Sequence, residues 1–227
     1  MLGTLLVFGC AYNVGGPTVG RTPSTAIRYV ALGDSYTIGT SVGETERFPN
    51  QLVARLGGTV DFQLIANLGV NGYASADLID DELPRLDALQ PEFVTVLIGV
   101  NDVVRGVSAD SYRANVAEIF DRLLEGLPAN RIVAVATPDY TRTPHGADFG
   151  DPDQQRAAIA QFNAIMRDAA DARGIAFVDI TPVADRADVE SILVASDGLH
   201  PSGVQYLRWV ELIAPVVSRL LAESRAE

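Results

Sequence analysis

Residues 27–36 read Ile-Arg-Tyr-Val-Ala-Leu-Gly-Asp-Ser-Tyr, a short apolar run that ends in a glycine and two polar residues. A run of nearly continuous hydrophobicity followed by turn residues predicts a β-strand buried on both faces. Further runs of this kind cover residues 60–66, 93–98, 132–136 and 175–180. The sequence therefore predicts five buried strands.

Longer amphipathic stretches separate these strands. Helical patterns cover residues 49–56, 74–89, 109–125, 154–173 and 202–222. Gly126 and Gly174 follow two of these patterns, in the place where helices commonly stop. Strands that alternate with helices predict a parallel sheet with helices on both faces. We therefore expect a single-domain, three-layer α/β/α fold with about five parallel strands.

The composition excludes several classes of function. The chain has 227 residues, enough for one large domain, and a net charge of −12 that would repel a phosphate backbone. We therefore expect no nucleic-acid partner. All 17 basic residues are arginine, which excludes lysine-based catalysis. No stretch approaches the roughly 20 apolar residues of a membrane-spanning helix.

The N-terminal residues 1–26 differ from the rest of the chain. Residues 1–9 are apolar or small, and Val-Phe-Gly-Cys at 7–10 resembles the lipobox of a bacterial lipoprotein, although no positive residue precedes it and the apolar run is short. Residues 11–26, rich in Gly, Pro, Thr and Ser, would then be a flexible tether. We expect a truncated lipoprotein signal with a lipid anchor at Cys10 and an extracytoplasmic location. The alternative is a plain apolar N-terminus on a cytoplasmic protein.

Side chains suited to catalysis lie where ligands bind in such sheets, at the carboxyl ends of strands and in a C-terminal loop. Ser35 follows the first strand, where its hydroxyl can face a cleft. Asn101 follows the third strand and offers an uncharged amide donor. His200 precedes the last helix, and Asp197 can fold back to its Nδ1–H. Taken singly, these motifs also fit a capped turn, an Asx turn and a surface histidine.

The loop after the second strand has the sequence Asn-Leu-Gly-Val-Asn-Gly-Tyr at 67–73. Its glycines and asparagines suit a turn that presents a backbone N–H to the cleft, and they suit any other tight turn equally well. Gly72 and Gly69 are both candidates for the residue that presents this N–H.

Together these four segments resemble the SGNH hydrolases, also called the GDSL esterase/lipase family, over residues 27 to 220. The resemblance implies a flavodoxin-like catalytic domain at 27–223 that cleaves carboxylic esters of short-chain or lipid acyl groups through an acyl-enzyme. It assigns the nucleophile to Ser35, the base to His200 and its orienting acid to Asp197. Ser35, Gly72 and Asn101 would form the oxyanion hole, with no metal or organic cofactor. Tyr36 replaces the leucine of the family's Gly-Asp-Ser-Leu block and should change the pocket wall more than the chemistry.

Other polar residues receive a structural interpretation. No carboxylate stands at a helpful spacing from His145, so we interpret it as a surface or lid histidine. The loop 139–153 around it could cover the cleft. Asp80, Asp81 and Glu82 fall on a helical pattern and are expected to form a solvated face. Trp209 is expected to pack in the core.

Rival functions remain open. A carbohydrate O-deacetylase or an acyltransferase would use the same three residues, and a non-catalytic binding module could use the same fold. The presence of Ser35, Asn101, Asp197 and His200 together argues against a binding module. A nucleotide-binding domain would need a glycine-rich phosphate loop after the first strand, and residues 33–39 do not match one.

Overall fold

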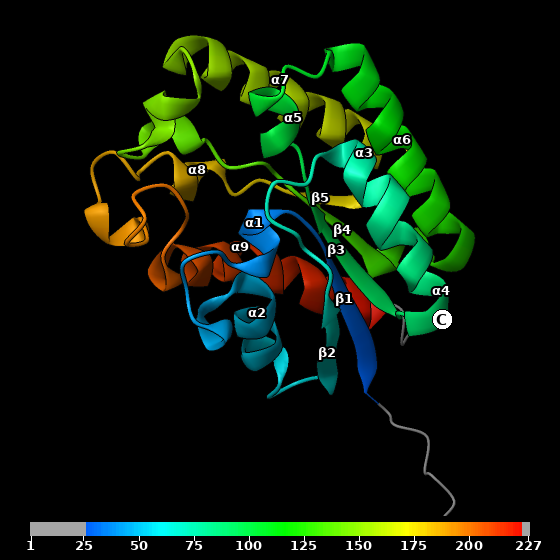
Figure 1. Ribbon diagram of the computed structural model, residues 1–227. Helices are drawn as coiled ribbons and strands as arrows, with labels where there is room; N and C mark the ends of the chain where they lie inside the picture. Colours follow the sequence, from blue (N-terminus) through cyan, green and yellow to red (C-terminus); the bar gives the residue numbers. More distant parts are fainter. Residues whose placement is uncertain (1–25, 224–227) are drawn as a thin grey trace, which may run out of the picture.

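The computed structural model describes residues 26–223, which form one sheet with helices on both faces (Figure 1). Its strands are β1 (Ile27–Gly33), β2 (Phe62–Asn67), β3 (Phe93–Leu97), β4 (Ile132–Val135) and β5 (Ala176–Val178). All pairs are parallel, in the order β2-β1-β3-β4-β5. The predicted fold class is confirmed, and the largest difference in strand length is at β5, which has 3 residues where a run over 175–180 was expected. Cys10 and the rest of residues 1–25 lie outside the described part.

Two groups of helices cover the sheet. The helices are α1 (Ser35–Ile38), α2 (Phe48–Leu56), α3 (Ser75–Asp77), α4 (Leu86–Leu89), α5 (Val100–Val104), α6 (Ala109–Gly126), α7 (Pro152–Asp171), α8 (Thr181–Ala184) and α9 (Gly203–Glu223). On one face α2 packs against α9, and on the other α6 packs against α7 (Figure 1). None of the helices within residues 26–223 is both long enough and apolar enough to cross a membrane.

The helix predicted for residues 74–89 is wrong as a single element. The chain there passes from α3 through a π-helical turn (Leu78–Glu82) and a 3-10 turn (Leu83–Arg85) into α4. Pro84 lacks the N–H that a continuous α-helix requires, and the wide turn before it rotates Glu82 toward the sheet. This rotation overturns the expectation that Glu82 belongs to a solvated face. Asp80 and Asp81 are exposed as predicted.

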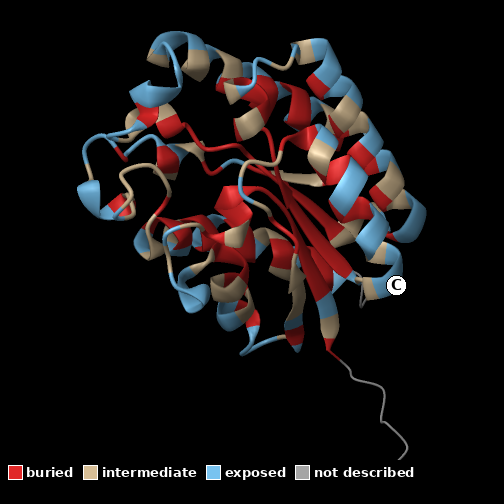
Figure 2. Ribbon diagram, in the orientation of Figure 1, coloured by how far each residue is buried: buried red, intermediate tan, exposed pale blue. Residues whose placement is uncertain are grey.

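The core lies on both sides of the central strands. Every residue of β3 and β4 is buried, which explains why their sequences are almost entirely apolar (Figure 2). Trp209 on α9 is fully buried, and its ring packs edge-on against Tyr206 at 5.1 Å between ring centroids. The predicted packing role of Trp209 is confirmed.

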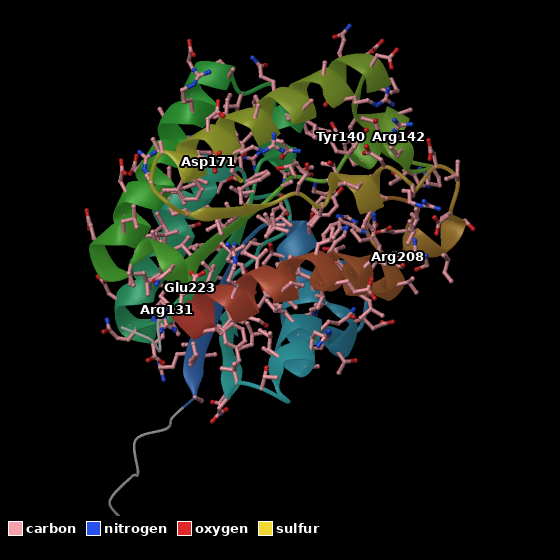
Figure 3. All side chains as sticks on the ribbon, turned by 180° about the vertical axis from the view of Figure 1, so that it is seen from behind. Arg131, Tyr140, Arg142, Asp171, Arg208 and Glu223 are labelled. Atoms are coloured by element: carbon pink, nitrogen blue, oxygen red, sulfur yellow. The ribbon has the colours of Figure 1, made fainter. Side chains whose placement is uncertain are left out.

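The parallel strands bring several loops to one edge of the sheet. Figure 3 shows Tyr140 and Arg142, in the turn after β4, on the same side of the molecule as Arg208 near the start of α9. Glu223, at the other end of α9, lies on the opposite side with Arg131. The edge at which the strands end therefore also receives the loop that precedes α9, and the candidate site forms there.

Candidate active site

Ser35 is the first residue of α1, directly after β1. Asp34 caps this short helix, because its Oδ1 accepts the Tyr36 N–H at 2.9 Å. Gly33 allows the sharp turn: its φ is 147°, and a Cβ there would lie 2.0 Å from the Leu97 carbonyl oxygen. Ser35 is 8% exposed. As the first residue of a helix, it has a backbone N–H with no intrahelical acceptor, and this N–H is available to a ligand.

The contacts of the loop after β2 within the described part show which of its two candidate glycines has a free backbone N–H. The Gly69 N–H donates to Asn67 Oδ1 at 3.1 Å, and a Cβ at Gly69 would lie 2.7 Å from the Ile38 nitrogen. Gly69 is therefore needed for close packing, and its N–H is occupied. Gly72 has a φ of 83°, lines the pocket beside Ser35, and its N–H has no acceptor among residues 26–223. Of the two, Gly72 is placed to donate to a ligand.

Asn101 lies in α5, at the end of β3. Its Nδ2 donates to the Tyr73 carbonyl oxygen at 2.9 Å and lies 3.5 Å from Asp34 Oδ2. The first contact anchors the amide, whereas the second is too long to be a strong hydrogen bond. The second N–H of the amide therefore remains available to a ligand oxygen in the pocket.

His200 and Asp197 form a hydrogen-bonded pair in the loop before α9. His200 Nδ1 lies 2.7 Å from Asp197 Oδ2, while Asp197 Oδ1 accepts the backbone N–H groups of Leu199 and His200, both at 2.9 Å. Burial opposes the ionisation of this carboxyl, but hydrogen bonds from Ser41, Leu199 and His200 outweigh it and hold its pKa well below its usual range. Asp197 is therefore a carboxylate that fixes the imidazole with Nε2 free.

Ser35 and His200 line the same pocket, with a volume of about 230 Å³. Ser35 and His200 share this pocket without a hydrogen bond between their side chains. The pocket also contains Gly72 and Asn101, so the structure brings together all the site residues predicted from sequence except Asp197, which contacts the pocket through His200. The apolar wall consists of Tyr36, Val100, Val104, Tyr140, Phe149 and Leu199.

Three buried carboxyl groups, those of Asp34, Glu82 and Asp102, lie close to the candidate residues in the chain or in space. Glu82 Oε2 accepts the Gly33 N–H at 2.9 Å, and Glu82 Oε1 has no hydrogen-bond partner within residues 26–223. Burial raises the pKa of Glu82 to about 9, and burial with the nearby Asp102 charge raises the pKa of Asp34 to about 7. Asp102 accepts both the N–H and the hydroxyl of Ser75. Asp34 and Asp102 thus both serve as structural hydrogen-bonding groups beside the candidate catalytic residues.

The sequence analysis of His145 was wrong in one respect. Asp148, three residues later, lies 2.8 Å from His145 Nδ1, so a carboxylate does stand at a suitable spacing. His145 and Asp148 have 58% and 65% of their side-chain surface exposed, against 14% and 29% for His200 and Asp197. The His145 ring packs against Gly198 and does not line the pocket. The segment around it does cover the cleft, because Tyr140 and Phe149 form part of the pocket wall.

Two further residues that contact the site have no signature in the sequence. The Ser41 hydroxyl donates to Asp197 Oδ2 at 2.6 Å, and the Arg105 guanidinium donates to the Gly72 carbonyl oxygen. Neither residue belongs to a motif that points to catalysis, so neither could be selected before the fold was known. No group of three or more His, Cys, Asp or Glu residues within the described part is arranged to hold a metal ion.

Solved structures share this architecture at low sequence identity. A single-substitution variant of Axe2, an acetyl xylan esterase from Geobacillus stearothermophilus, superposes with a TM-score of 0.68 at 19% identity, covering 85% of this chain and 95% of that one. A lipase/acylhydrolase from Enterococcus faecalis superposes with a TM-score of 0.67 at 17% identity, covering 85% of this chain and 96% of that one. TesA superposes with a TM-score of 0.65 at 20% identity, covering 85% of this chain and 99% of that one. At such low sequence identity, these similarities show that the chain shares the fold of these proteins.

Sequence comparison supplies the family. No curated protein matches the sequence significantly. The sequence profile of the GDSL-like lipase/acylhydrolase family matches residues 31–207, which include every candidate residue named for the pocket. With the fold of SGNH esterases and a serine, a histidine and an asparagine in one pocket, the chain belongs to the GDSL-like lipase/acylhydrolase family, whose members hydrolyse ester bonds.

Proposed function

We propose that the protein is a serine carboxylic-ester hydrolase with Ser35 as nucleophile, His200 as general base and Asp197 as the orienting acid. The observation that carries the proposal is the 2.7 Å hydrogen bond between His200 Nδ1 and Asp197 Oδ2, with His200 and Ser35 in one pocket. This bond fixes the tautomer in which Nε2 can accept a proton.

The reaction proceeds in two stages. His200 Nε2 takes the proton of Ser35 Oγ as this oxygen attacks the ester carbonyl carbon. The carbonyl oxygen becomes an oxyanion that accepts hydrogen bonds from the Ser35 N–H, the Gly72 N–H and Asn101 Nδ2, each worth about 3 kcal/mol. His200 then protonates the leaving alcohol as the bond from the carbonyl carbon to the alcohol oxygen breaks. Water, deprotonated by His200, then attacks the carbonyl carbon of the acyl-enzyme. The bond from this carbon to Ser35 Oγ breaks as His200 returns the proton to Oγ, which releases the acid and restores Ser35.

The pocket favours a short acyl group. Its volume of about 230 Å³ is below the roughly 300 Å³ at which pockets for drug-sized ligands begin. Val104 and Phe149 present apolar surface on its wall and no charge, which suits an acyl chain. We therefore place short-chain esters ahead of long-chain lipid esters as substrates.

Two alternative functions use the same catalytic chemistry and differ in the alcohol that takes part in the reaction. A carbohydrate O-deacetylase is supported by the small size of the pocket and by the acetyl xylan esterases among the structural neighbours. An acyltransferase would pass the acyl group to another alcohol instead of water. Neither requires a different role for Ser35 or His200.

Hydrolysis of a p-nitrophenyl ester series from acetate to palmitate tests the proposal, with wild type, Ser35→Ala and Ser202→Ala in parallel. Ser202 is a matched control, because it lies close to His200 in sequence and its hydroxyl donates to the Ile192 carbonyl oxygen outside the pocket. We expect turnover that is highest on the shortest esters, is lost in Ser35→Ala and is kept in Ser202→Ala. Equal turnover in wild type and Ser35→Ala would overturn the assignment of the nucleophile.

Assays with acetylated xylan, and assays with an added acceptor alcohol, distinguish these alternative functions. Acetate release from the polysaccharide far above that from p-nitrophenyl acetate would favour the deacetylase. Formation of a new ester in the presence of the acceptor would favour the acyltransferase. A folded protein with no turnover on any ester would favour a binding module.

We also propose that Cys10 carries a lipid anchor on an extracytoplasmic protein, on the evidence of the Val-Phe-Gly-Cys motif at 7–10. Mass spectrometry of the protein from its native membrane fraction tests this. An unmodified Met1 would overturn it.

A further inference from the structure

The loop between α1 and α2 reaches the Asp197 carboxylate. Ser41 Oγ donates to Asp197 Oδ2 at 2.6 Å, and this is the same oxygen that lies 2.7 Å from His200 Nδ1. Ser41 is 156 residues from Asp197 in the sequence. One carboxylate oxygen therefore accepts two hydrogen bonds, from the imidazole and from a hydroxyl on a distant loop.

These contacts complete the hydrogen bonding of Asp197. Its Oδ1 accepts the backbone N–H groups of Leu199 and His200, so each oxygen accepts two donors. An ionised carboxylate offers about four acceptor positions, and here all four are used. Without Ser41, Asp197 Oδ2 would keep only the imidazole to stabilise its charge and fix its direction.

The backbone of Ser41 is unusual. Its φ is 66°, and among residues 26–223 only Gln90 is another non-glycine residue with positive φ. This left-handed conformation is unfavourable for serine and persists when surrounding contacts hold it. The hydrogen bond to Asp197 is one of the contacts that hold Ser41 in this conformation.

The neighbouring residues connect the same loop to the rest of the site. The Gly39 and Thr40 N–H groups both donate to the Ser35 carbonyl oxygen at 3.0 Å. Thr40 Oγ1 donates to Asn71 Oδ1 at 2.6 Å, beside Gly72. The loop thus contacts the nucleophile's helix, the Gly72 loop and Asp197, so Ser41 is held in place from several sides.

We infer that Ser41 is a positioning residue that acts through Asp197: its hydroxyl fixes the direction of Oδ2 and shares the carboxylate charge with the imidazole of His200. This inference rests on the proposed function, because Ser41 affects catalysis only if Asp197 and His200 have the proposed roles. Its structural part, the coupling of Ser41 to His200 through Asp197, can be measured without a substrate.

Removal of the hydroxyl should make His200 more basic. With one donor fewer, Asp197 stabilises the protonated imidazole more strongly, and the pKa of His200 rises. The phenols that are close to Asp197, those of Tyr36 and Tyr206, have their pKa values raised well above their usual range by burial and stay neutral. Burial raises the pKa of Asp34 to about 7, and the Ser41 substitutions remove no hydrogen bond of this carboxyl.

The experiment is an NMR titration of the full chain labelled at histidine. The chain has 2 histidines, so His145 provides an internal reference. Ser41→Ala and Ser41→Gly both remove the hydroxyl, and only glycine also relieves the backbone strain. We expect the pKa of His200 to rise by about 0.5 to 1 in both variants and that of His145 to stay constant. With an active enzyme, the acid limb of kcat/KM should move by the same amount, and kcat/KM at neutral pH should fall about fivefold to twentyfold.

Two controls test whether the effect of Ser41 on His200 depends on Asp197. Ser196→Gly removes an exposed serine next to Asp197 whose hydroxyl has no partner in the described part, and it should leave the His200 titration unchanged. In an Asp197→Asn background, Ser41→Gly should no longer shift His200. Circular dichroism confirms folding of each variant.

The outcomes separate the inference from the proposed function. An unchanged His200 titration in both Ser41 variants would overturn the inference even if Ser35-dependent esterase activity is present. A shift in Ser41→Ala alone would assign the effect to backbone strain and would equally overturn it. The expected shift in a protein without esterase activity would support the coupling while the proposed function fails.

Discussion

Arg105, the residue directly after α5, holds the Gly72 carbonyl oxygen from outside the pocket. Its Nη2 donates to this oxygen, while its Nη1 donates to Asp77 Oδ2 at 2.8 Å. Asp77 Oδ2 also accepts the Ala74 N–H at 2.8 Å, and Asn101 holds the next carbonyl, that of Tyr73. A backbone fixed at consecutive carbonyl groups cannot rotate freely, so an exposed arginine helps to set the direction of the Gly72 N–H.

Arg105→Gln should therefore lower activity more than stability. We expect kcat on p-nitrophenyl acetate to fall about tenfold with KM little changed, since an oxyanion donor acts in the transition state. The Arg105–Asp77 pair is about half exposed on the arginine side, so its loss should change the free energy of unfolding by less than about 1 kcal/mol. Steady-state kinetics and urea denaturation measure the two effects.

Arg113→Gln is the matched control, because Arg113 forms an exposed ion pair with Asp110 on α6 that does not contact the pocket. Its kinetics should equal those of the wild type. If Arg105→Gln raises KM and leaves kcat unchanged, Arg105 contributes to substrate binding instead of holding the Gly72 loop.

Asp197→Asn should reduce kcat/KM by about three to four orders of magnitude, as expected when the orienting carboxylate of such a triad becomes an amide. The amide can donate to His200 Nδ1, which favours the tautomer whose Nε2 carries the proton and cannot accept another. The variant should fold, since the amide oxygen can still accept the Leu199 N–H now bound by Oδ1. Kinetics over a range of pH check this, and a loss below tenfold would contradict the role of Asp197.

The acyl pocket should respond to the size of residue 104. Val104→Phe adds a ring to the wall and should shift the preference in the p-nitrophenyl series toward acetate, while Val104→Ala should extend it by about one or two carbons. Val189→Phe is the control, since Val189 is 77% exposed and does not line this pocket. An unchanged chain-length profile in both Val104 variants would place the acyl chain elsewhere.

The positions of the candidate residues could be predicted because they follow from topology. Ser35, Gly72 and Asn101 lie in the segments that follow parallel strands, and such strands end at one edge of the sheet. The resemblance to the SGNH hydrolases selects these residues within the segments. The short spacing between Asp197 and His200 allowed their pairing to be expected from the sequence. The strands themselves were predictable since those at the centre of the sheet are apolar on both faces.

The supporting contacts could not be predicted, because each joins residues distant in sequence. Ser41 is 156 residues from Asp197, Arg105 is 33 from Gly72, and Glu82 is 49 from Gly33. No local pattern encodes such a pair. The solvated face expected for Glu82 is wrong for a related reason: the sequence there has a regular helical pattern, whereas the π-helical turn before Pro84 points Glu82 inward.

The buried Glu82 should give the protein an unusual dependence of stability on pH. Burial raises its pKa from 4.5 to about 9, despite the hydrogen bond from the Gly33 N–H. Between these values the folded protein holds a proton that the unfolded chain has released, so a rise in pH favours unfolding. The raised pKa of Asp34, about 7, acts in the same direction. The free energy of unfolding should therefore fall as pH rises through this window.

Glu82→Gln removes one of these titrating groups and keeps an oxygen that can accept the Gly33 N–H. Whatever its absolute stability, the variant should lose less free energy of unfolding than the wild type between about pH 5 and about pH 8, as measured by urea denaturation. Glu125→Gln, at an exposed position of α6, should follow the wild type. Parallel pH profiles for wild type and Glu82→Gln would mean that Glu82 ionises in the fold as readily as in the unfolded chain. In that case its buried Oε1 must have a hydrogen-bond donor that stabilises the charge, such as an internal water molecule.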